Sequence, residues 1–132
     1  MKTLAIAIGG ATGAGVRWYV ITLSPVGKAF PWPVFVINVL GCALLGIFVA
    51  EEWTHPKAQV LLRDFAGIGF CGGLTTFSTF AVEIAKFGRD GRYQLAAIYS
   101  VASIVCGLFA AFLTAYASHH YRALELPLEE QP

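Results

Sequence analysis

Charged residues are scarce in this sequence. Only 13% of its 132 residues are charged, whereas 57% are hydrophobic and the mean hydropathy is +0.67. A soluble domain needs more polar surface than this composition supplies. The scarcity of charge therefore excludes an ordinary soluble protein and predicts an all-α integral membrane protein whose surroundings are a lipid bilayer. We expect no nucleic-acid partner.

Side chains that bind metals or form disulfides are also few. The three cysteines lack CxxC spacing and fall within apolar stretches, where thiols pack as small apolar groups. The three histidines lie outside those stretches, without acids or thiols at the spacing of metal ligands. No nucleophile, base and orienting group converge, so we expect no enzyme. These residues are Cys42, Cys71, Cys106, His55, His119 and His120.

Long apolar stretches are abundant. A hydrocarbon core about 30 Å thick needs about 20 apolar residues. A secretory signal peptide competes for the first stretch, but the apolar run continues past a cleavage point to Arg17, so we keep it as a helix that starts the mature chain at Met1. The acidic tail, 122–132, is expected to be loosely ordered. The sequence predicts one domain, 1–132, with transmembrane helices at 4–23, 34–50, 65–86 and 95–118.

Positive charges are balanced between the two ends of this predicted bundle. Four spans place four Lys or Arg residues on each side, so the excess that normally sets orientation is missing. We expect insertion in both orientations and an antiparallel two-fold homodimer that uses one patch twice. The alternative is a single orientation set by some other feature. One side carries Lys2, Lys57, Arg63 and Arg122, and the other carries Lys28, Lys86, Arg89 and Arg92.

The third predicted span contains the block GFCGGLTTFSTF, residues 69–80. Its three glycines each weaken a helix by roughly 0.8 to 1 kcal/mol, and four hydroxyl residues follow. We predict that the helix opens here. Because an opened helix leaves backbone groups without partners, such breaks persist in bilayers where they line a cavity or bind an ion. For any single residue the alternative is a glycine-rich packing seam with hydroxyls bonded to the preceding turn.

Three strongly polar side chains accompany this block. Arg17, near the end of the first span, either extends to the headgroups or forms an electropositive vestibule that concentrates anions. Asn38, within the second span, either bonds another helix or donates its NH₂ group to an anion. Glu83, after the block, either pairs with a nearby cation or serves a vestibule or gate.

Two phenylalanines and a row of hydroxyls complete the candidate site. Phe77 and Phe80 stand three residues apart on adjoining parts of one helical face. Phenylalanines in apolar spans usually pack, but a ring presented edge-on offers its positive edge to a small anion. Hydroxyls beside small residues in the fourth span can escort a dehydrated ion or hold helices together. That stripe comprises Tyr99, Ser103, Gly107 and Thr114.

At these residues the chain resembles a known family. GFCGGLTTFSTF, with GGATGAGVRW at 9–18 and NVLGCALLG at 38–46, is similar to the Fluc (CrcB) family of fluoride channels, and the resemblance covers all four spans. It implies a third helix broken in mid-membrane and antiparallel, dual-topology homodimers with two fluoride pores. It also implies a structural Na⁺ at the dimer interface, and the short chain resembles bacterial members in the cell (inner) membrane.

The resemblance implies roles for particular residues. Main-chain carbonyls of Gly72 and Thr75 would hold the Na⁺, and Arg17 and Glu83 would lie in the vestibules. Gly107 stands where a further hydroxyl of the fourth-helix track is expected, which leaves the later course of that track open. The ion pathway would be lined by Asn38, Thr76, Phe77, Ser78, Thr79, Phe80, Tyr99 and Ser103.

These expectations converge on a passive, fluoride-selective channel that exports cytoplasmic fluoride and relieves its toxicity. Two alternatives remain. A proton-coupled exporter of small molecules needs a titratable carboxylate near the midplane, and its candidate, Glu83, stands at a helix end. A membrane scaffold would use the glycines for packing alone.

Overall fold

The structure is a computed structural model that describes residues 2–24, 30–50 and 55–125. Every regular element in these ranges is helical. Lys28 and the tail at 126–132, both used above, lie outside the described residues. The elements are α1 (Lys2–Leu23), α2 (Trp32–Ala50), α3 (Pro56–Ala58), the π-helical segment η1 (Gln59–Cys71), α4 (Gly72–Leu74), α5 (Phe77–Arg89) and α6 (Tyr93–Glu125).

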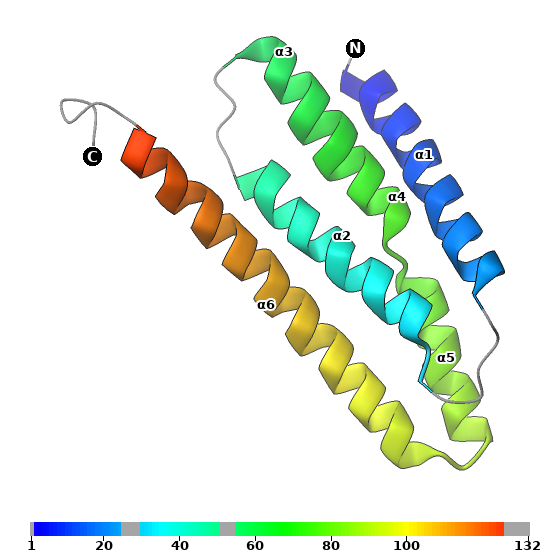
Figure 1. The fold of residues 1–132 in the computed structure, drawn as a ribbon. Coiled ribbons are helices and arrows are strands. Elements are labelled where there is room, and N and C mark those ends of the chain that lie inside the picture. Colours follow the sequence, from blue (N-terminus) through cyan, green and yellow to red (C-terminus); the bar gives the residue numbers. More distant parts are fainter. Residues whose placement is uncertain (1, 25–29, 51–54, 126–132) are drawn as a thin grey trace.

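The helices form an elongated bundle in which successive passes run in opposite directions. Figure 1 shows the start of α1, α3 and the end of α6 toward one end of the bundle, and the end of α1, the start of α2 and the α5–α6 connection toward the other. α1 packs chiefly on η1, and α2 packs chiefly on α6. This arrangement places the middle of the third helix beside both α1 and α2.

Three of the described helices are long and apolar enough to cross a membrane: Lys2–Leu23, Gln59–Arg89 and Tyr93–Tyr121. A shorter apolar helix, Trp32–Phe48, makes the remaining pass. The prediction of an all-helical, multi-pass membrane protein is therefore confirmed. The antiparallel dimer stays a prediction.

Helix boundaries differ from those expected. The third helix begins at Pro56 rather than at 65, and the last helix runs to Glu125 rather than 118. Residues 122–125, which were assigned to the tail, are therefore helical. The reason is that hydropathy detects only the part of a helix that suits hydrocarbon, whereas a helix continues past it wherever its backbone bonds can form.

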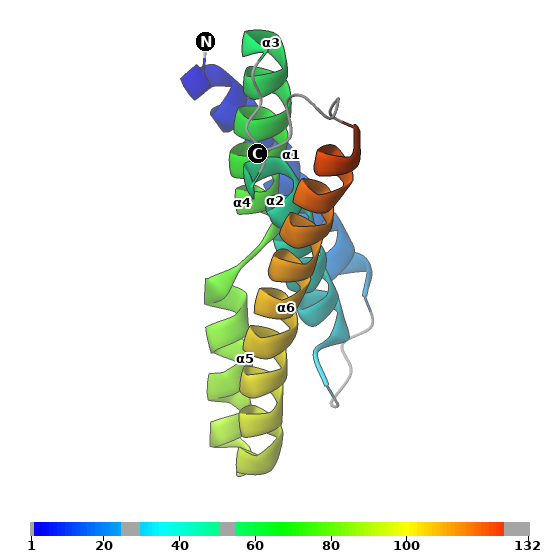
Figure 2. The same ribbon diagram turned by 90° about the vertical axis from the view of Figure 1, so that its left-hand side faces the viewer.

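The third helix is interrupted at Thr75 and Thr76. α4 ends at Leu74 and α5 begins at Phe77, and Figure 2 shows a non-helical connection between α4 and α5. The predicted interruption is present, but the glycines before it remain helical. The opening lies inside the predicted block, 69–80, at its threonines rather than at its glycines.

The glycines instead allow α1 to pack closely on the third helix. A Cβ at Gly13 would collide with the main chain of Phe70 and Leu74, and a Cβ at Gly73 would collide with the main-chain oxygen of Gly10. Two backbones meet directly where side chains are missing. The packing-seam alternative is therefore correct for these glycines.

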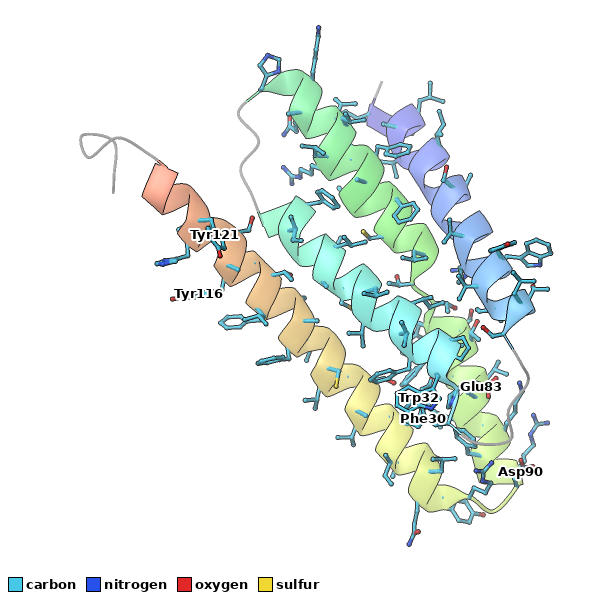
Figure 3. All side chains as sticks on the ribbon, viewed as in Figure 1. Phe30, Trp32, Glu83, Asp90, Tyr116 and Tyr121 are labelled. Atoms are coloured by element: carbon cyan, nitrogen blue, oxygen red, sulfur yellow. The ribbon has the colours of Figure 1, made fainter. Side chains whose placement is uncertain are left out.

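A small aromatic core joins α5 to α6. Phe80 and Tyr99 are buried, with ring centroids 5.3 Å apart. Phe30 makes an edge-on contact with Tyr99 at 5.3 Å, and Figure 3 shows Phe30 close to Trp32 where α2 begins. These contacts fix α5, and with it the residues that follow the break, against α6.

Candidate functional site

Two consecutive threonines make the break. Thr75 has extended backbone angles (φ −73°, ψ 154°), and its hydroxyl donates to the main-chain oxygen of Cys71 at 3.0 Å. Thr76 is also extended, and its Oγ1 accepts the N–H of Thr79 at 3.2 Å. Threonine is a favoured N-cap because its hydroxyl satisfies one of the free N–H groups of a helix start. One helix therefore ends, and the next begins, within two residues.

Asn38 holds the peptide groups of Thr76. Its Oδ1 accepts the Thr76 N–H at 2.8 Å, and its Nδ2 donates to the Thr76 carbonyl at 3.1 Å. α2 thereby supplies partners for backbone groups that the break removes from the helix. The interhelical alternative for Asn38 is realised. An amide NH₂ has a second N–H donor, and this donor can serve a ligand.

Arg17 reaches the break from α1. Its Nη1 donates to the Thr75 carbonyl at 2.9 Å, and its side chain is half-buried. A cation near the C-terminal end of a helix is stabilised by the carbonyls that remain free there. Arg17 therefore stabilises the end of the helix that stops at Leu74. The sequence did not predict this contact, and the vestibule role of Arg17 stays a prediction.

A cavity of about 270 Å³ lies beside the break. Its polar groups are the Asn38 amide, the Cys42 thiol and hydroxyls from the break and from α6. A volume of this size can hold a small ion together with several water molecules. It is lined by Asn38, Cys42, Leu45, Thr75, Thr76, Phe77, Phe80, Ser103 and Ile104.

The two phenylalanines of the cavity differ in exposure. Their ring centroids are 5.6 Å apart. Phe80 is 8% exposed and packs against Tyr99, whereas Phe77 is 80% exposed. Phe80 packs against other side chains, as phenylalanines in apolar spans usually do, and its ring also borders the cavity. Phe77 presents most of its ring to whatever covers this face of the chain.

The hydroxyl residues of α6 have two different environments. Thr114 donates to the main-chain oxygen of Ala43 at 2.8 Å and so ties α6 to α2. Tyr99 Oη and Ser103 Oγ are buried, and within the described part of the chain neither makes a well-aligned hydrogen bond, although the two hydroxyls lie close enough to interact with each other. An unpaired buried hydroxyl is costly. Of the two, Ser103 lines the cavity, where a ligand could satisfy it.

The remaining predicted residues lie on α5. Thr79 Oγ1 accepts from Thr76 Oγ1 at 3.1 Å, and Ser78 Oγ lies 3.2 Å from the same atom. These hydroxyls therefore form one cluster at the start of α5. Glu83 lies farther along α5, where its Oε1 accepts from Lys86 Nζ at 2.7 Å. The ion-pair alternative for Glu83 is thus observed.

Two residues of interest were not singled out from the sequence. Cys42 lines the cavity, and a Cβ at Gly107 would lie 3.3 Å from its Sγ. Cys42 stands four residues after Asn38, so both lie on one helical face. This spacing could have indicated from the sequence that Cys42 shares the site of Asn38. Asp64 of η1 is 6% exposed, and its Oδ2 has no partner among the described residues. Asp64 is the acidic residue at the start of the apolar stretch of the third span, and an acid in such a stretch could have marked it for attention.

Comparison with known proteins agrees with this geometry. The family model described as CrcB-like protein, Camphor Resistance (CrcB), matches residues 4–115. "Fluoride-specific ion channel FluC 1" of Streptomyces coelicolor is 40% identical over 116 residues, which cover 86% of this chain and 74% of that protein. The protein of the same name in Mycobacterium bovis is 42% identical over 110 residues, 83% of each chain. "Fluoride-specific ion channel FluC 2" of Rhodococcus jostii is 40% identical over 113 residues, 86% and 95% of the two chains.

The apolar helices define a multi-pass membrane protein, and a mostly apolar cavity that carries a few polar groups lies beside its broken helix. The chain belongs to the CrcB family, because the family model covers most of it and relatives are about 40% identical over most of their length. The resemblance stated from the sequence is confirmed. Since the family is one of ion channels, the prediction that the protein is not an enzyme is confirmed as well.

Proposed function

We propose that this protein is a passive, fluoride-selective channel that exports fluoride from the cell and relieves its toxicity. The observation that carries the proposal is the cavity beside the broken third helix, which combines hydrogen-bond donors with two phenylalanine rings. The names of the relatives, fluoride-specific ion channels, support the choice of ion.

The cavity chemistry suits fluoride in particular. Fluoride is small and strongly hydrated, so a pathway must replace its water with donors, as selectivity filters do for other ions. Donors come from the second N–H of the Asn38 amide and from the hydroxyl of Ser103. The first N–H groups of α5 have no partners within the helix and form its positive end. The edges of Phe77 and Phe80 add positive potential without binding the ion irreversibly. Ser78, Thr79 and Tyr99 would continue the pathway from this cavity.

Two copies in opposite orientations would complete two pores. The balance of positive charge between the two sides removes the usual preference for one orientation. In a single chain Phe77 is 80% exposed, which leaves an aromatic surface for a second copy. In this arrangement Arg17 and Glu83 would lie toward the vestibules. The homodimer would reside in the bacterial cell (inner) membrane.

A Na⁺ ion between the two copies is part of this proposal. Thr75 is extended, so its carbonyl leaves the helical ladder, and one of its two lone pairs accepts from Arg17. Gly72 is exposed, and the space where a Cβ would lie is open. Both carbonyls can therefore face a neighbouring copy, and two copies would supply four oxygens. The ion would add positive charge that lowers the cost of an anion in a low-dielectric region.

Export needs no coupled energy source. Hydrogen fluoride forms in acid surroundings, crosses membranes and dissociates inside the cell, so the ion leaves through a passive pore. A proton-coupled exporter would need a carboxylate that loads and releases protons near the midplane. Its candidate, Glu83, is instead bonded to Lys86 near the end of α5. This pairing favours the channel over the exporter.

Fluoride release from liposomes that contain the purified protein tests the phenylalanine pathway. Phe77→Ile and Phe80→Ile should each lower the rate by roughly tenfold or more, because isoleucine fills space but has no positive ring edge. The matched control is Phe109→Ile on α6, which is 64% exposed and outside the cavity lining. Release that persists in both pathway variants would contradict the proposed route. Release that stops when the proton gradient is collapsed would favour the exporter.

A further inference from the structure

The contact between Arg17 and Thr75 places a permanent positive charge at the break. Arg17 Nη1 lies 2.9 Å from the Thr75 carbonyl oxygen, on a side chain that is half-buried between α1 and the third helix. A guanidinium keeps its charge in every protein environment. The oxygen is therefore occupied on one side by a cation that belongs to the chain itself.

The backbone at this point explains why a cation is favourable. The helix that ends at Leu74 leaves its last carbonyls without helical partners, and they form the negative end of its dipole. Thr75 N–H still bonds to the Cys71 oxygen at 3.0 Å, whereas the Thr75 carbonyl points out of the ladder. Within the described part of the chain, Arg17 supplies the donor for this carbonyl.

We propose that Arg17 is a built-in cation of the break, which holds the Thr75 carbonyl in position and weakens the binding of Na⁺ to that oxygen. The inference rests on the Na⁺ site and the two-copy assembly proposed above. Two cations on one carbonyl oxygen repel each other, because they are only a few ångströms apart in a region of low dielectric. Arg17 is thus a positioning residue that sets how strongly the folded protein depends on Na⁺.

The consequence is a dependence on Na⁺ that increases when the guanidinium is removed. Arg17→Gln keeps an N–H donor and loses the charge, so the carbonyl becomes a better Na⁺ ligand and the break has no internal cation. Arg17→Lys keeps the charge. A ligand that binds only the folded state raises its stability by an amount that grows with the logarithm of the ligand concentration divided by the dissociation constant. The melting temperature therefore reports the effect without any measurement of ion flux.

The experiment is a Na⁺ titration of the purified full-length protein in detergent. The melting temperature is followed by tryptophan fluorescence while NaCl replaces N-methyl-D-glucamine chloride at constant ionic strength. The rise of the melting temperature with Na⁺ concentration is fitted as one-site binding to the folded state, and the fitted dissociation constant is taken as the Na⁺ midpoint. For Arg17→Gln this midpoint should be lower than for the unmodified protein by roughly tenfold or more. Arg17→Lys should stay within about twofold. Arg89→Gln, an equal charge change at the exposed end of α5, should leave the midpoint unchanged.

Equal midpoints for the unmodified protein and Arg17→Gln would overturn the inference, as would the absence of any Na⁺ effect. A tenfold fall in Arg17→Lys would also overturn it, since the charge is retained there. That comparison stands even where Arg17→Gln does not fold. Fluoride release is measured on the same preparations. An unmodified protein that releases no fluoride would refute the proposed function, whereas the Na⁺ midpoints would still report on Arg17.

Discussion

Side chains from two other helices hold the backbone of the break. Asn38 binds both peptide groups of Thr76, and Arg17 binds the carbonyl of Thr75. Each contact satisfies a group that would otherwise be unpaired in an apolar environment, at a cost of several kcal/mol. The break is therefore a defined structure with partners of its own, and its geometry depends on single residues far away in the sequence.

Asn38→Ala tests this dependence directly. The substitution leaves the Thr76 N–H without its acceptor, and it should lower the free energy of unfolding by about 1–3 kcal/mol. It should also slow fluoride release by roughly tenfold or more, because the cavity loses a donor and its fixed wall. Thermal unfolding and liposome release measure the two effects. Ser100→Ala removes a hydroxyl that only bonds back to Ala96 within α6, and it should change neither.

If Asn38→Ala had the same free energy of unfolding as the unmodified protein, the role of Asn38 in holding the peptide groups of Thr76 would be contradicted. The sequence predicted Asn38 as a buried amide that needs partners, and it named interhelical bonding as one outcome. It did not identify Thr76 as the partner, because the pairing joins residues 38 apart in the chain. The contact of Arg17 with Thr75 could not be predicted for the same reason, since periodicity and hydropathy describe only neighbours within one helix.

The close approach of α1 to the third helix is a property of whole helices. Gly13 faces the main chain of Phe70 and Leu74 so closely that a Cβ would overlap both. Two rigid backbones cannot yield as a flexible side chain can. The seam therefore sets the distance of α1 from the break, and this distance determines whether Arg17 reaches Thr75.

Gly13→Ala should push α1 outward. Overpacking of this kind costs about 1–3 kcal/mol of stability, and the lost reach of Arg17 should add Na⁺ dependence to the melting temperature. Gly15→Ala is the matched control, because apart from the adjacent residues and backbone of α1 itself no atom of the described residues lies within 4 Å of its Cβ position. A Gly13→Ala protein as stable as the Gly15→Ala protein would show that the seam is looser than described.

The break itself was partly predictable. Glycines and the hydroxyl residues that follow them indicated an opening within 69–80, and the span is interrupted inside that block, at Thr75 and Thr76. Glycine lowers helix propensity without supplying an alternative partner for the backbone. Threonine supplies one through its hydroxyl, as the cap on Thr79 shows. Capping chemistry would have located the break more accurately than helix propensity.

As a complete molecule, the chain leaves much apolar surface uncovered. Phe77 is 80% exposed, and Figure 3 shows Tyr116 of α6 directed away from the other helices. Lipid covers part of such a surface. The sequence predicted four passes from its apolar stretches, and the helical architecture agrees. The proposed dimer is inferred from the balance of Lys and Arg between the two sides and from the exposed apolar surface. Neither observation determines which helices of the two copies contact each other.

Insertion in both orientations can be measured on cells. Arg89→Cys places a thiol at the exposed end of α5, and the unmodified protein, whose cysteines lie in the spans, serves as the blank. A membrane-impermeant thiol reagent should label about half of the Arg89→Cys molecules before permeabilisation and the rest afterwards, because positive charge does not favour either orientation. Labelling of all molecules, or of none, in intact cells would show a single orientation.

The most direct measurement is the release of fluoride and of chloride from liposomes that contain the unmodified protein, each recorded with an ion-selective electrode. A cavity that replaces water around a small, strongly hydrated anion should release fluoride rapidly and leave chloride release at the level of protein-free liposomes. Equal rates for the two ions, or retention of fluoride, would contradict the proposal that the broken third helix builds a fluoride pathway.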